Sequence, residues 1–244
     1  EKKIYNLKKK LNVTAFIAPS NWVKKKVNLS KDFNKIQTFR IANTLDTNFF
    51  KKNKIKYKKN SINLGYCVDG LKQYHKGFDL FSKIIKNLSK KSKKKIIIHF
   101  LGDKNFEEKL NLKFYETKNL KIIQYPKTNK KIELLKFYTN IDLLLVTSRT
   151  ETFCQVASEA MSCSVPIVAF KIGGLIDIVE SKRLGRLIKP FDVNSFSNVL
   201  TNLSKNRLSM SKMSSNCRNH AIKNFDYKII SNKTHKIYKY LIGR

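Results

Sequence analysis

Short apolar runs alternate with amphipathic segments along most of this 244-residue chain. The runs KIIIHFL at residues 95–101 and IDLLLV at 141–146 have the length of buried strands. Between such runs, apolar residues recur at three- and four-residue steps, which is typical of helices. One such set is Phe78, Phe81, Ile84, Ile85 and Leu88. The alternation predicts an α/β fold, a Rossmann-like parallel sheet flanked by helices.

The same pattern predicts where the individual elements lie. The expected strands cover residues 13–18, 36–41, 62–68, 95–101, 120–125, 141–146, 165–170 and 184–188. The expected helices cover residues 20–27, 77–88, 106–114, 132–138, 153–162, 175–179, 193–203, 207–224 and 227–241. Ser20 can cap the first of these helices. The charged stretch 51–60 is the best candidate for a linker.

Two carboxylates, Glu151 and Glu159, stand eight positions apart across a predicted strand-to-helix junction. In a parallel α/β sheet, such a loop lies at the carboxyl edge of the strands, where ligands bind. Carboxylates bind hydroxyl groups, and the free N–H groups of a helix start bind phosphate. The junction therefore suits a polyhydroxyl ligand that carries phosphate. The alternative is that Glu151 is a solvated loop acid and Glu159 a charge on a helix surface.

Seven residues separate the two glutamates, and an ordered set of residues surrounds them. The set is Phe153, Ala160-Met161, Cys163, Pro166-Ile167-Val168-Ala169 and Gly173-Gly174. This segment resembles the E-x7-E signature of retaining family 4 glycosyltransferases of GT-B fold. The resemblance implies transfer of a sugar from a nucleotide-diphosphate sugar donor to a glycan or lipid acceptor, with retention of anomeric configuration.

The resemblance also implies a domain organisation. Residues 1–54 are expected to be the end of the acceptor domain and the interdomain linker. Residues 55–224 are expected to bind the donor, and residues 225–244 to form a helix that crosses back to the first domain. The chain then looks like the C-terminal half of a two-domain enzyme. Alone, such a half is expected to bind donor and to transfer little or no sugar.

Three side chains carry the expected chemistry. Lys76, in the sequence HKGF, is similar to the family lysine that binds the donor phosphates, and Glu151 to the glutamate that contacts the donor sugar. These two are the candidate catalytic residues. Glu159 is similar to the glutamate that accepts hydrogen bonds from the ribose. Lys76 lies at a predicted helix start, where the helix dipole disfavours a cation. A lysine at such a position indicates a functional role. The alternative is one more lysine in a lysine-rich chain.

The sequence departs from the family in the residues around this site. Leu71 stands where an arginine is usual, so either Lys72 substitutes as a point charge or donor binding is altered. The backbone of Phe153, Cys154 and Gln155 is expected to approach the sugar and phosphate. Cys154 stands where glycine is common, and its side chain could crowd the sugar, which leaves the identity of the donor open.

Three glycines, Gly102, Gly173 and Gly174, lie at the same predicted edge of the sheet. They could let the backbone approach a ligand, and plain turns explain them equally well. The cysteines form no C-x-x-C pair and the histidines no metal-ligand spacing, which favours reduced thiols in a cytosolic protein. We therefore expect no metal site and no cofactor; the donor is a substrate.

The chain is very basic, with 51 Lys and Arg against 17 Asp and Glu and a net charge of +34. Such a balance suggests nucleic acid or an anionic membrane surface as a partner. The lysines fall in many separate patches, however, which favours compositional bias. We expect a cytoplasmic protein with peripheral contact to an anionic inner membrane face, and no specific nucleic-acid partner. A nucleic-acid-binding domain and a non-catalytic scaffold half remain the alternatives.

Overall fold

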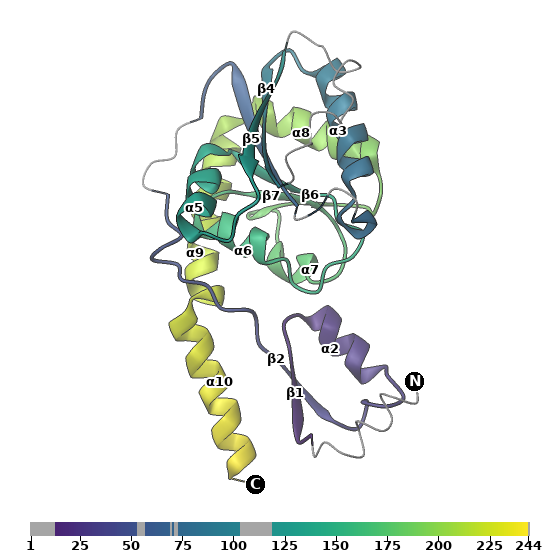
Figure 1. Ribbon diagram of the computed structural model, residues 1–244, viewed down its shortest axis with the longest axis vertical. Helices are drawn as coiled ribbons and strands as arrows, with labels where there is room; N and C mark the ends of the chain where they lie inside the picture. The colour runs from purple at the N-terminus through teal and green to yellow at the C-terminus, as the bar shows by residue number, and fades with distance from the viewer. Residues whose placement is uncertain (1–12, 53–56, 69, 71–72, 103–118, 244) are drawn as a thin grey trace.

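The structure is a computed structural model that describes residues 13–52, 57–68, 70, 73–102 and 119–243 (Figure 1). The helix predicted at 106–114 and the candidate Lys72 lie outside the described residues. Within the described part of the chain, no helix is both long and apolar enough to span a bilayer.

A six-stranded parallel sheet forms the centre of the molecule, as predicted. Its strands are β3 (Ser61–Cys67), β4 (Lys95–Gly102), β5 (Leu120–Pro126), β6 (Leu143–Val146), β7 (Ile167–Phe170) and β8 (Gly185–Ile188). Their order in the sheet is β5-β4-β3-β6-β7-β8, and every neighbouring pair is parallel. The chain runs outward from β3 to β5, returns to β6 beside β3, and then runs outward the other way. This reversal leaves a crevice at the carboxyl ends of β3 and β6, the usual ligand position in such sheets.

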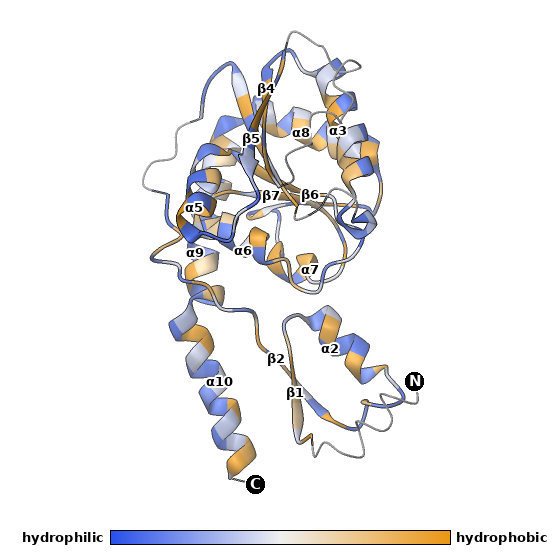
Figure 2. Ribbon diagram, in the orientation of Figure 1, coloured by the Kyte–Doolittle hydropathy of each residue, from blue (hydrophilic) through white to orange (hydrophobic). Residues whose placement is uncertain are grey.

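Helices cover both faces of the sheet (Figure 1). One face packs against α3 (Phe78–Lys91) and α8 (Val193–Lys205). The other packs against α5 (Lys131–Asn140), α6 (Gln155–Ser162) and α9 (Arg207–Phe225). Because side chains alternate along a strand, β6 supplies both cores: Leu143 and Leu145 to one, Leu144 and Val146 to the other. This explains why the central strands β6 (LLLV) and β7 (IVAF) read as continuous apolar runs, orange in Figure 2.

A smaller unit precedes this sheet. It contains the parallel strands β1 (Ala15–Ala18) and β2 (Gln37–Arg40) and the helix α2 (Asn21–Asn28). The Ser20 hydroxyl accepts a hydrogen bond from the Val23 N–H, which confirms the predicted cap. The last helix, α10 (Tyr227–Ile242), extends from the large sheet domain toward this unit (Figure 1). There its Tyr240 ring meets Phe39 edge-on, with ring centroids 6.1 Å apart.

Hydrogen bonds join the small unit to the loops at the carboxyl edge of the large sheet. The Ser20 hydroxyl donates to the Thr152 carbonyl at 2.6 Å. The backbone and side-chain amides of Asn21 both donate to the carboxylate of Asp177, on the short helix α7 (Leu175–Ile178). The small unit is therefore attached directly beside Glu151.

Arg218 on α9 holds the loop that leaves the small unit. Its Nη1 lies 2.7 Å from the Thr47 carbonyl oxygen, 3.1 Å from that of Phe50 and 3.0 Å from that of Ser162. The end of α9 adds a second anchor, because Asp226 accepts a hydrogen bond from the Thr47 hydroxyl. The loop from the small unit is thus fixed to the core by charge-assisted hydrogen bonds.

We expect Arg218→Met to lower the free energy of unfolding by about 2–4 kcal/mol, because the Thr47 and Ser162 carbonyl groups lose their charged donor. Urea unfolding would measure this. The control is Arg183→Met, which removes the same charge from an exposed side chain and should change stability by less than about 0.5 kcal/mol. Equal stability of the two variants would contradict the anchoring role of Arg218.

Candidate functional site

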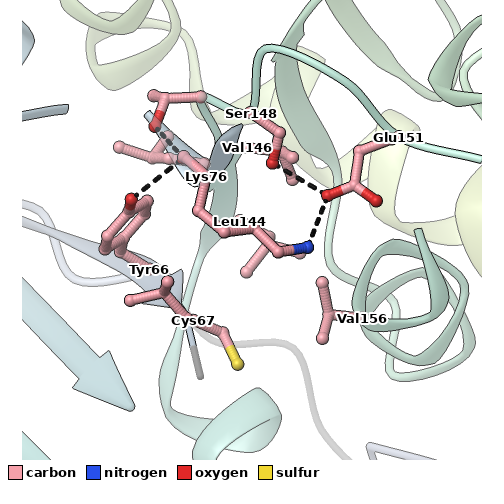
Figure 3. Close-up of a pocket in the computed structure, with 11 residues that line it drawn as sticks. Tyr66, Cys67, Lys76, Leu144, Val146, Ser148, Glu151 and Val156 are labelled. Atoms are coloured by element: carbon pink, nitrogen blue, oxygen red, sulfur yellow. Dashed lines mark hydrogen bonds and ion pairs between the residues drawn. The ribbon is translucent and has the colours of Figure 1, made fainter. Parts of the chain in front are cut away.

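A small cavity of about 60 Å³ lies in the crevice between the carboxyl ends of β3 and β6 (Figure 3). The lining residues come from β3, from β6 and its following loop, from the turn before α3 and from α6. They are Tyr66, Cys67, Val68, Lys76, Leu144, Leu145, Val146, Thr147, Ser148, Glu151 and Val156. A cavity of this size holds a few water molecules, so it fits one small polar group of a ligand.

An ion pair between Lys76 and Glu151 spans the cavity (Figure 3). Lys76 Nζ lies 2.9 Å from Glu151 Oε1, and the two side chains are 28% and 10% exposed. The Ser148 hydroxyl donates to the same carboxylate oxygen at 2.8 Å. A carboxylate, an ammonium and a hydroxyl therefore meet in one partly buried place, where electrostatic interactions are stronger than in water.

The turn that carries Lys76 differs from the sequence prediction. Lys76 ends a 3-10 turn, Tyr74–Lys76, and does not begin a helix; α3 starts at Phe78. The reason is Gly77, which has a left-handed φ of 68° and interrupts the helical path. A β-carbon on Gly77 would lie 2.0 Å from the Thr147 carbonyl oxygen, so the turn packs closely on the loop after β6.

The loop that carries Glu151 is held by Gly173 and Gly174. The Gly174 N–H donates to the Glu151 carbonyl at 2.9 Å. Gly173 has a φ of 47°, and a β-carbon there would lie 2.0 Å from the same carbonyl oxygen. The absence of side chains at these two glycines therefore lets their loop pack closely against the backbone of the Glu151 loop. Gly102 ends β4, where a β-carbon would lie 2.3 Å from the Val68 carbonyl oxygen.

Glu159 lies outside the cavity lining. It is on α6, 9% exposed, and its Oε2 accepts a hydrogen bond from the Tyr138 hydroxyl of α5 at 2.7 Å. Burial raises the pKa of this carboxyl group. The structure thus brings Lys76 and Glu151 together and places Glu159 in a separate contact. Glu159 is buried, which does not fit a solvated charge on a helix surface.

The residues between the two glutamates form the start of α6. The helix predicted at 153–162 begins at Gln155, because Cys154 has a left-handed φ of 81° and lies just before it. That conformation strains a side chain and explains why glycine suits this position. Phe153 is buried against Phe225, with ring centroids 5.7 Å apart, and the Gln155 side chain donates to the Thr44 carbonyl.

Sequence reasoning missed Ser148 and Tyr138. Ser148 follows β6 within the same loop as Glu151, so its place at the carboxyl edge was available as a signal. Tyr138 meets Glu159 because α5 and α6 pack in the same core on one face of the sheet, and no sequence spacing indicates that contact. All four cysteines are free thiols. Among the described residues, no group of three or more His, Cys, Asp or Glu could hold a metal ion.

The chain matches known glycosyltransferases in sequence and in structure. The family model described as glycosyl transferases group 1 matches residues 49–223. An uncharacterized glycosyltransferase of Methanocaldococcus jannaschii is 30% identical over 152 residues, which are 62% of this chain and 41% of that relative. A glycosyltransferase from Rickettsia africae aligns with a TM-score of 0.77 at 18% identity, over 95% of this chain and 64% of its own. HepE from Anabaena, solved in complex with UDP-glucose, aligns with a TM-score of 0.72 at 19% identity, over 93% of this chain and 64% of its own.

The parallel sheet with helices on both faces is a Rossmann-like half of the GT-B fold. The chain belongs to the group 1 glycosyl transferases. It spans less than half the length of the curated relatives it matches.

We expect Gly173→Ala to lower the free energy of unfolding by about 2 kcal/mol, because the new methyl group would overlap the Glu151 carbonyl and strain a left-handed residue. Urea unfolding would measure this change in the free energy of unfolding. Gly243→Ala is the control, since Gly243 is exposed, has an ordinary φ of −80°, and a β-carbon there would lie 3.3 Å from the Lys239 carbonyl oxygen, without the overlap found at Gly173. If both variants were equally stable, the Glu151 loop would not depend on Gly173.

Proposed function

We propose that this chain is the donor-binding half of a retaining, family 4 glycosyltransferase that uses a nucleotide-diphosphate sugar. The observation that carries the proposal is the Lys76–Glu151 pair at the carboxyl ends of β3 and β6, where the strand order reverses. The family match supports glycosyl transfer in general terms. No cofactor and no metal are part of the proposal.

The chemistry of the pair fits this reaction. Cleavage of the bond between sugar and diphosphate builds negative charge on the leaving group. Lys76 would neutralise that charge in the transition state, which is where added electrostatic stabilisation accelerates a reaction. Glu151, held by Ser148 and Lys76, would face the donor sugar and bind its hydroxyl groups. An incoming phosphate would compete with Glu151 for the Lys76 ammonium, so donor binding would change the contacts of both.

The other expected site residues keep supporting roles in this proposal. Glu159 would accept hydrogen bonds from the ribose, and the backbone at Phe153, Cys154 and Gln155 would face the sugar and phosphate. Residues 1–54 would belong to the acceptor side and linker, 55–224 to the donor domain and 225–244 to the crossover helix. The acceptor would be a glycan or a lipid-linked glycan, handled at an anionic membrane surface on the cytoplasmic side. Peripheral attraction of about 1 kcal/mol per nearby lysine would assist this contact.

The first experiment is a calorimetric titration of the chain with uridine, guanosine and adenosine diphosphates. One of the three should bind clearly more tightly than the others; the UDP-glucose complex of HepE makes UDP the first to try. Lys76→Met should weaken that affinity about 10- to 100-fold, the size expected for a lost hydrogen bond to a charged group. Lys90→Met, on an exposed part of α3, is the matched control and should leave affinity unchanged.

Failure of all three diphosphates to bind the folded chain would reject the proposed function. Binding that is equal in Lys76→Met and Lys90→Met would leave a nucleotide site but remove Lys76 from it.

A second titration tests Glu159. If Glu159 accepts hydrogen bonds from the ribose, Glu159→Gln should weaken binding of the preferred nucleotide about tenfold. The same variant should not change the affinity for the 2′,3′-dideoxy form of that nucleotide, which lacks the hydroxyl groups. Tyr138→Phe is the companion variant, because it removes the partner hydroxyl and keeps the carboxylate. An equal loss with both nucleotide forms would mean that Glu159 acts only through packing.

A further inference from the structure

Arg149 connects the two segments that form the cavity, although it does not line the cavity itself. Its Nη1 and Nη2 each donate to one carboxylate oxygen of Asp79 at 2.8 Å. Nη1 also donates to the Tyr74 carbonyl at 2.9 Å, and the backbone N–H of Arg149 donates to the His75 carbonyl at 2.7 Å. The guanidinium carbon lies 3.8 Å from the centre of the Tyr74 ring.

These contacts surround Lys76. Tyr74 and His75 precede it, Asp79 follows it, and all three are held by a residue only two positions before Glu151. The Lys76 carbonyl itself receives longer hydrogen bonds, 3.3 Å each, from the hydroxyl groups of Tyr66 and Thr147. Apart from the ion pair, the short bonds between the Lys76 turn and the loop after β6 include those made by Arg149 and one from the Thr147 hydroxyl to the Gly77 carbonyl at 2.9 Å.

Only an arginine can make this set of contacts. Its planar guanidinium donates to both oxygens of one carboxylate while its face stacks on an aromatic ring. A lysine has the same charge but no fork and no flat face. The contact lowers the pKa of the Asp79 carboxyl, with the hydrogen bond from Arg149 as the largest cause. Asp79 therefore stays ionised, and the pair persists at neutral pH.

We propose that Arg149 is a positioning residue: with Asp79 and Tyr74 it sets the location of the Lys76 ammonium relative to Glu151. The effect on ligand affinity rests on the proposed function, whereas the effect on the Lys76 side chain does not. Without Arg149 the turn 74–76 keeps its sequence and its lysine, but the lysine must be ordered when a diphosphate binds. That ordering lowers affinity, because side-chain and backbone freedom is lost on binding.

The alternative is an exposed ion pair that adds a little stability and nothing else, as many surface pairs do. Asp79 is 49% exposed as a side chain, so this alternative is serious. The two ideas differ in what they predict for Lys76. A positioning residue acts through the lysine, and its effect disappears when the lysine is absent. A general stabiliser acts independently of it.

A double-mutant cycle makes that comparison. Arg149→Met should weaken binding of the preferred nucleoside diphosphate about tenfold. The same change made in Lys76→Met should weaken it less than twofold. Arg149→Lys, which keeps the charge and loses the fork, should behave like Arg149→Met. Arg183→Met is the control for lost charge and should leave affinity unchanged. A tenfold loss that persists in the Lys76→Met background would overturn the proposal.

Reactivity of Lys76 provides a readout that needs no nucleotide. Brief acetylation with acetic anhydride, followed by peptide mass spectrometry, reports each lysine separately. Lys76 should react at least threefold faster in Arg149→Met than in the unmodified chain, and Lys90 should not change. Asp79→Asn, which keeps the arginine, should show the same rise in the rate of Lys76 acetylation. This variant replaces Arg149→Met in the experiment if Arg149→Met does not fold. Unchanged reactivity of Lys76 in a folded variant would overturn the positioning role, while absence of nucleotide binding by the unmodified chain would reject only the proposed function.

Discussion

The contact between the Lys76 ammonium and the Glu151 carboxylate depends on one feature of the sheet, the adjacency of β3 and β6. These strands are far apart in the chain, and β4 and β5 lie between them in sequence. Because β6 returns to the side of β3, the segments that follow both strands meet at the same edge. Two opposite charges more than seventy residues apart can then share a partly buried cavity. Everything proposed for ligand binding follows from that adjacency.

The scarce acidic residues hold the loops around this edge. The chain has only 17 Asp and Glu, yet several of them join separate elements. Asp177 binds the backbone at the start of α2, Asp226 binds Thr47, and Asp79 binds Arg149. The first contact joins α7 to the start of α2, and the other two each join a loop to a helix end. Most lysines among the described residues are exposed, so their charge lies on the surface and not in the core.

Much of the fold could be predicted because burial on both faces makes central strands such as β6 and β7 apolar throughout. The apolar run at 141–146 predicted a strand, and the structure has β6 at Leu143–Val146. The helical spacing from Phe78 to Leu88 likewise predicted α3. What could not be predicted depends on backbone conformation or on contacts across helices. The left-handed conformation of Cys154 makes α6 begin at Gln155, two residues later than predicted. Apolar periodicity does not indicate such a backbone conformation. The bond from Tyr138 to Glu159 depends on α5 and α6 sharing one face of the sheet, so Glu159 could be marked as a candidate but its contact could not be predicted.

The Ser20 hydroxyl has two simultaneous tasks: it accepts from Val23 at the start of α2 and donates to the carbonyl of Thr152, the neighbour of Glu151. A rigid swing of the small unit away from the sheet must either break that bond or drag the backbone next to the carboxylate with it. A displacement of the small unit would thus reach the backbone beside Glu151 through the Ser20 hydroxyl, and α7 through the bonds from Asn21 to Asp177.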